Sequence, residues 1–70
     1  MIRAVIFDKM LYSRDSISRA REIYLSYGEI TIEEGTDSHK VVFSANTDTV
    51  DQLVGEFSNY LIFIEASQEL

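Results

Sequence analysis

The sequence predicts one α+β domain over residues 1–70, with the element order β-α-β-β-α. Short apolar runs that favour strands occur in three places, and apolar residues recur at helical spacing in two others. Capping and turn residues separate these segments. A chain of 70 residues holds one domain, and its 46% of apolar residues is typical of a globular one.

The first strand and the first helix are predicted from an apolar run followed by a cap. Residues 2–8 contain a short run of apolar residues, which favours a strand. Ser13 is the expected N-cap, and Asp15 lies in the first turn, where a carboxylate favours the helix dipole. Gly28 is expected to end this helix in the left-handed conformation. The apolar side of the helix spans roughly 120° and comprises Ile17, Ala20, Ile23, Tyr24 and Tyr27.

A hairpin is predicted next. Ile30 and Ile32 alternate with polar residues, which indicates a strand with one solvated face. Residues 35–38 (GTDS) have turn chemistry, and 41–43 (VVF) form the third strand. His39, beside the turn, is expected to be an exposed turn residue.

A long helix is predicted after residues 47–49 (TDT), which supply capping residues. Thr49 and Gln52 have the spacing of a capping box. The apolar stripe runs to about Ser67 and comprises Val50, Leu53, Val54, Phe57, Leu61 and Ile64.

The order of these elements predicts the topology. A right-handed crossover from the first strand to the second leaves room for the third strand between them. Two helices then cover one face of a three-stranded antiparallel sheet. This arrangement is that of a ferredoxin-like domain without its last strand.

Charge and composition narrow the function. The net charge of −6 disfavours nucleic acid as a partner. No apolar run is long enough for a membrane span, and the N-terminal run is too short for a signal peptide, so a cytoplasmic protein without membrane contact is expected. Cysteine is absent. Because such a small chain gains little net stability from its own core, association with another chain, including a homo-oligomer, is expected.

Two stretches resemble one protein family. Residues 7–13 (FDKMLYS) resemble the opening "FD-x-x-x-YS" region of the His-Xaa-Ser system protein HxsD family, and residues 55–61 (GEFSNYL) resemble its "GEF-x-N-x-L" region. The motif residues are Asp8, Tyr12, Ser13, Gly55, Glu56, Phe57 and Asn59. The resemblance implies an accessory protein, with no assigned chemistry, for radical-SAM-type proteins thought to modify peptides rich in His-Xaa-Ser repeats. The chain departs from the family at residues 62–64 (IFI), where the family tends to be charged.

No catalytic residue, metal or cofactor is expected. A radical-SAM cluster needs three cysteines, and the chain has none. The adjacent residues Asp37, Ser38 and His39 do not converge as a catalytic triad must. Glu33 and Glu34, with Asp37 and His39, could offer metal ligands, but a solvated hairpin is the preferred interpretation. The structural interpretation is also preferred for Asp8, Tyr12 and Ser13, with contacts to a peptide as the alternative.

Protein binding is therefore the leading hypothesis. Both sheet faces are rich in apolar residues, and two helices cover one face, so we expect the other to meet a partner. The outer edge of the first strand is expected to accept an extended peptide or a second copy. The predicted contact residues are Val5, Phe7, Val42, Tyr60, Ile62 and Phe63. A dimeric small-molecule-sensing domain is the alternative, and an acidic inhibitor of a basic partner is a third hypothesis.

Overall fold

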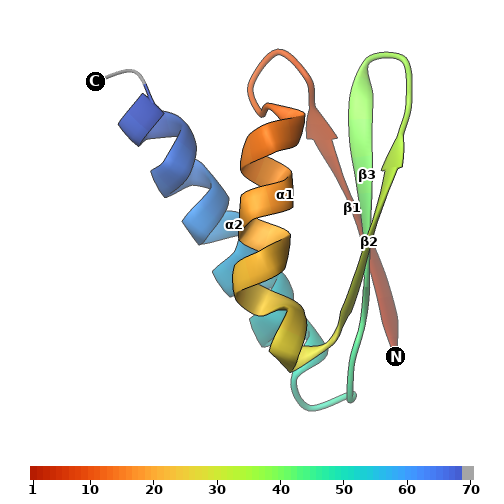
Figure 1. Ribbon diagram of the computed structural model, residues 1–70. Helices are drawn as coiled ribbons and strands as arrows, with labels where there is room; N and C mark the ends of the chain where they lie inside the picture. The colour runs from red at the N-terminus through yellow and green to blue at the C-terminus, as the bar shows by residue number, and fades with distance from the viewer. Residues whose placement is uncertain (69–70) are drawn as a thin grey trace.

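The computed structural model describes residues 1–68 and confirms the predicted order of elements (Figure 1). The elements are β1 (Ile2–Asp8), α1 (Arg14–Tyr24), a 3-10 turn (Leu25–Tyr27), β2 (Glu29–Glu34), β3 (Ser38–Ser44) and α2 (Val50–Gln68). Among these residues, neither helix combines the length and the apolar character that crossing a membrane requires.

The sheet has the predicted topology. Its strand order is β1-β3-β2, and both pairings are antiparallel. Val42 of β3 lies between Ala4 of β1 and Thr31 of β2, which fixes the register across the sheet. Figure 1 shows α1 and α2 together on one side of the sheet, with α2 leaning away from it toward its C-terminal end. The chain is thus an α+β domain with two helices on one face.

The core lies between the helices and the sheet. Val41 and Phe43 of β3 are fully buried beneath Phe57 and Leu61 of α2. The rings of Phe43 and Phe57 meet edge to face with centroids 5.0 Å apart, a favourable arrangement for aromatic pairs. Ile17 of α1 closes the same core. The stripe predicted for the second helix therefore packs where the helical spacing placed it, and so do Ile17 and Ala20 of α1. The stripe predicted for the first helix is wrong at Ile23 and Tyr27, which are 52% and 66% exposed, and Tyr27 lies in the 3-10 turn after α1.

The ends of α1 confirm one expectation and correct another. The Ser13 hydroxyl accepts a hydrogen bond from the Ser16 amide at 3.1 Å, as an N-cap does. Gly28, however, is extended, with φ 168° and ψ 177°, and does not adopt the left-handed conformation. Glycine is needed there because a Cβ atom would lie 2.7 Å from the carbonyl oxygen of Ser44. Close approach to β3, and not helix termination, accounts for this residue.

The start of α2 differs in detail from the predicted capping box. The Thr49 hydroxyl donates to the carbonyl oxygen of Asn46 at 3.2 Å. The amides of Thr49 and Val50 donate to the same carbonyl, at 3.0 and 2.9 Å. The turn before the helix thus closes on Asn46, outside the predicted capping segment.

Candidate functional site

One face of the sheet is open, and its apolar part lies on the β1 side. Ile2 and Ile6 have 64% and 60% of their surface exposed. The register places Ala4 between them and Val42 directly beside Ala4 on β3. We call these four residues, Ile2, Ala4, Ile6 and Val42, the open-face patch. Toward β2 the same face becomes polar, because Lys40 and Glu33 continue the row of Ile6.

The backbone hydrogen bonds decide which groups point out of the sheet. The Lys9 amide donates to the Asp37 carbonyl oxygen at 3.0 Å, and the Gly35 amide donates to that of Ser38 at 2.8 Å. Paired and outward-pointing residues alternate along an antiparallel strand. The odd-numbered residues of β1 therefore bond to β3, and its even-numbered residues direct their N–H and C=O groups outward. In β2 the even-numbered residues point outward for the same reason.

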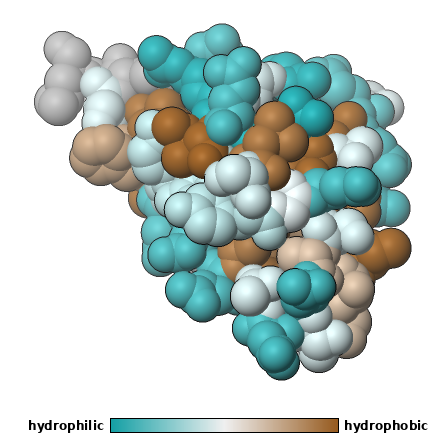
Figure 2. All heavy atoms as spheres, turned by 60° about the horizontal axis from the view of Figure 1, so that its bottom comes forward, coloured by the Kyte–Doolittle hydropathy of each residue, from teal (hydrophilic) through white to brown (hydrophobic). Residues whose placement is uncertain are grey.

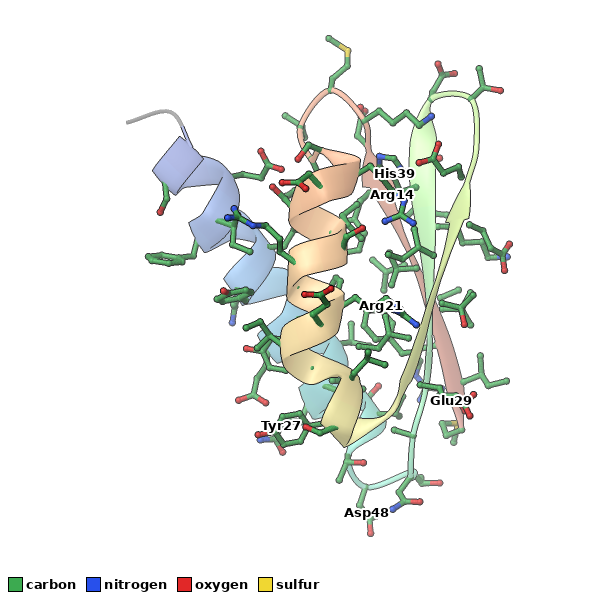
Figure 3. The ribbon with its side chains drawn as sticks, viewed as in Figure 1. Arg14, Arg21, Tyr27, Glu29, His39 and Asp48 are labelled. Atoms are coloured by element: carbon green, nitrogen blue, oxygen red, sulfur yellow. The ribbon has the colours of Figure 1, made fainter. Side chains whose placement is uncertain are left out.

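The two edges of the sheet are covered differently. On β2, Arg21 reaches from α1 and donates to the carbonyl oxygen of Ile30 (Figure 3). Arg14 Nε lies 3.3 Å from a carboxylate oxygen of Glu34 at the other end of that strand. On β1, no hydrogen bond within the described residues engages the outward groups of Ala4 and Ile6. The edge of β1 is therefore the less covered of the two, although among the described residues only the Ile30 carbonyl of β2 is engaged in this way and the outward groups of Ile32 are not.

The predicted contact residues of the sheet do not share one face. Val42 belongs to the open-face patch, but Val5 and Phe7 lie on the helix side of β1. Phe7 is buried, and its ring meets that of Tyr12 edge to face at 5.3 Å. These two side chains therefore contribute to the core of the domain. Alternation along the strand selects their even-numbered neighbours for the open face.

The predicted contact residues of α2 are exposed on different sides of the helix. Ile62 and Phe63 have 54% and 65% of their surface exposed. The ring centroids of Phe63 and Tyr60 are 6.3 Å apart, and both residues line a surface groove between α1 and α2. Ile62 lies about 20° around the helix from Asp51, and Asp51 forms an ion pair with Arg3 of β1 at 3.0 Å. Phe63 thus belongs to the helix groove, and Ile62 to the β1 side.

The helix groove combines apolar and charged side chains. Its lining residues are Arg19, Glu22, Ile23, Tyr60, Phe63, Ile64 and Ser67. Tyr24 lies beside it, with its ring 5.9 Å from that of Tyr60. Desolvation raises the Tyr24 pKa, and the nearby Glu56 carboxylate raises it further. Figure 2 shows apolar atoms reaching the surface in patches set among polar side chains.

The motif residues near β1 have structural roles. The Asp8 carboxylate accepts from the Met10 amide at 2.7 Å, and its carbonyl oxygen accepts from the amides of Leu11 and Tyr12. Asp8 therefore shapes the loop that leads to the Ser13 cap. In the second motif, Phe57 is a fully buried core residue, whereas Gly55, Glu56 and Asn59 are exposed.

A hydrogen-bond network joins the N-terminal end of α1 to the C-terminal part of α2. Glu65 of α2 accepts from the Ser13 amide at 2.8 Å and from the Ser13 hydroxyl at 3.1 Å. Desolvation opposes ionisation of Glu65, but the bonds from Ser13 and Ser16 outweigh it and lower its pKa. Leu61 and Ile64 are buried in the same turns. The end of α2 is therefore tied to α1.

His39 corrects the sequence interpretation. It lies inside β3 on the helix side and has 3% of its surface exposed, so it is not an exposed turn residue. Its Nδ1 atom is 3.8 Å from Glu34 Oε1, beyond hydrogen-bond distance. Arg14 and Lys9 approach the same carboxylate at 3.3 and 3.6 Å. Figure 3 shows His39 and Arg14 at the same end of the domain. The strand begins at Ser38, one residue before His39, which alternation then places inward.

The possible metal ligands of the hairpin do not converge. Glu34 and His39 face the helices, while Glu33 lies on the open face. Residues 1–68 contain no group of three or more His, Asp or Glu side chains placed to hold a metal ion. The solvated-hairpin interpretation holds for Glu33, but not for the buried His39.

Comparison with models of known families, with curated proteins and with solved structures finds no match to this chain. The fold and the surface geometry therefore carry the functional argument.

Proposed function

We propose that this chain is a non-catalytic protein-binding module and that the open-face patch is its contact surface. The observation that carries the proposal is the position of Ile2, Ala4, Ile6 and Val42 side by side on a face that neither helix covers. Contiguous exposed apolar residues rimmed by polar ones are typical of protein contact sites. Glu33 and Lys40 form such a rim next to Ile6.

The resemblance to the HxsD family supports an accessory role in a peptide-modification system. The motif residues Asp8, Tyr12, Ser13 and Phe57 shape a loop, a helix cap and the core. Structural roles for these motif residues agree with a family to which no chemical reaction is assigned. The proposed partner is the modifying enzyme or its substrate peptide, and the proposed setting is the cytoplasm.

The proposal is tested by titrating the ¹⁵N-labelled protein with a synthetic peptide of His-Xaa-Ser repeats and, separately, with a radical-SAM-type enzyme of such a system. We expect amide shifts to concentrate at the open-face patch. Ile6→Lys should weaken binding at least about tenfold, as loss of a central apolar contact does. Ile23→Lys is the matched control, since Ile23 is similarly exposed but lies on α1. Equal binding by both variants, or no shift with either probe, would contradict the proposal.

Small-molecule sensing is the second candidate, and the helix groove is the observation that favours it. Ile23, Tyr60 and Phe63 offer apolar contacts there, and Arg19 and Glu22 offer charged ones. The groove is open at the surface, however, whereas small-molecule sites bury most of their ligand. Ligand-induced shifts confined to this groove, with none at the open-face patch, would favour sensing.

A further inference from the structure

The outward backbone groups of β1 define a second possible contact, separate from the open-face patch. Ala4 and Ile6 direct N–H and C=O groups out of the sheet, and the described residues provide nothing that pairs with them. An edge strand of seven residues without proline is a template for another strand. We propose that this edge pairs with β1 of a second copy, antiparallel, across a two-fold axis beside Ala4.

The register follows from which groups are available. Only pairings that set even-numbered residues opposite even-numbered residues form hydrogen bonds between the two copies. An axis beside Arg3 would place two guanidinium groups directly opposite each other, which is unfavourable. An axis beside Val5 would require Asp8 to form hydrogen bonds with the second copy. Its carbonyl oxygen, however, already accepts from the amides of Leu11 and Tyr12. An axis beside Ala4 avoids both conflicts.

The Ala4 register also matches the side chains. It sets Ile2 opposite Ile6 of the second copy, so that two strongly exposed residues meet on the open face. It sets Arg3 opposite Val5, while Asp51 of the same chain balances the Arg3 charge. Arg3 also contacts the outward Ile2 carbonyl at 3.3 Å, a weak surface contact that strand pairing would replace. The edge is therefore complementary to itself in both hydrogen bonding and hydrophobicity.

The size of the contact sets the expected affinity. A pairing of five residues per strand buries a total surface area at or below roughly 1,200 Å², the value that separates standard interfaces from weak ones. We therefore expect a weak dimer, which forms at protein concentrations of about 10 µM to about 1 mM. Self-pairing depends on the outward backbone groups of β1, whereas partner binding depends on the side chains of the open-face patch. The side chains of Ile2 and Ile6 contribute to both. Either can fail without the other.

Single cysteines test the pairing, because the natural chain has none. Ala4→Cys places a cysteine on each side of the axis, and the Cα atoms of the two cysteines are about 5.5 Å apart. This distance is within the range for a disulfide. Val42→Cys is the matched control. It lies on the same face, but three strand spacings, or about 14 Å, separate it from its copy. On mild oxidation we expect Ala4→Cys to form at least about tenfold more cross-linked dimer than Val42→Cys. Equal cross-linking of the two variants would overturn the proposal.

Sedimentation of proteins without added cysteine provides the second measurement. The mass of the wild type should rise from 8.0 kDa toward twice that value with concentration. Ala4→Pro, which removes only an outward N–H, should stay monomeric with its circular dichroism unchanged. If Ala4→Pro does not fold, the cysteine pair decides. A wild type that remains at 8.0 kDa up to about 1 mM would overturn pairing between copies.

Discussion

At the scale of single residues, Glu65 connects the stability of the fold to pH. Its carboxylate accepts from Ser13, and its pKa is lowered in the folded protein. A lowered folded pKa contributes stability above the unfolded pKa, and this contribution is lost as the pH falls through the folded pKa.

Glu65→Gln should therefore lower the free energy of unfolding at about pH 7 by about 1 kcal/mol, a value reduced for solvent screening. The difference from the wild type should shrink below about pH 4.3 and vanish at lower pH, where the wild-type carboxyl is also neutral. Urea unfolding at several pH values measures it. A difference that stays constant from neutral to acid pH would show that the Glu65 charge has no such role.

His39 provides a prediction of the opposite sign. Its buried Nδ1 atom has no protein hydrogen-bond partner in the described residues. Because an unsatisfied buried polar atom costs about 1–3 kcal/mol, His39→Leu should raise the free energy of unfolding by about 1 kcal/mol. Urea unfolding at neutral pH checks this. A loss of stability would indicate that the long contact with Glu34 is worth more than the desolvation of the ring.

At the scale of elements, two glycines should respond in opposite ways to the same change. A Cβ atom on Gly55, inside α2, would meet nothing within 4 Å. Gly55→Ala should therefore stabilise the protein by about 1 kcal/mol, because alanine favours a helix. Gly28→Ala should destabilise it by about 2 kcal/mol or more, because the new Cβ atom would lie too close to β3. Thermal unfolding of the two variants compares them directly, and a shift in the same direction for both would refute this account.

The exposed end of α2 yields a prediction for two neighbours. Ile62 lies on the β1 side and Phe63 in the helix groove. Ile62→Asp should weaken an association that uses the β1 side, whereas Phe63→Asp should weaken only binding in the groove. Both variants should keep the helical circular dichroism signal, since both side chains are exposed. If neither change alters self-association or partner binding, the exposed apolar residues of α2 have no role in contact.

At the scale of the whole molecule, the periodicity of apolar residues was enough to predict the element order and the buried stripe of α2, and the handedness of the crossover predicted the sheet topology. Prediction failed where tertiary contacts decide. Gly28 has the signature of a helix end, but the approach of β3 determines its conformation. His39 follows a turn motif, yet the strand that contains it begins one residue earlier and buries it.

The candidate site was predicted in outline but not in its residues. A run of apolar residues in β1 indicates a strand without showing which of its two faces the helices cover. Phe7 and Val5 therefore could not be separated from Ile2 and Ile6 by composition alone. The Arg21 contact with the Ile30 carbonyl of β2, and the Glu65 contact that ties α2 to α1, join residues distant in sequence with no local pattern to mark them.

The central claim is that the β1 side of the sheet meets another polypeptide chain, and amide hydrogen exchange tests it most directly. In the dilute protein the outward amides of Ala4 and Ile6 should exchange fast, while those of Val5 and Phe7, bonded to β3, should exchange slowly. Raising the protein concentration to about 1 mM should slow exchange at Ala4 and Ile6, whose amides pair with a second copy, and leave Val5 and Phe7 unchanged. Exchange at Ala4 and Ile6 that stays fast under every condition would contradict the account.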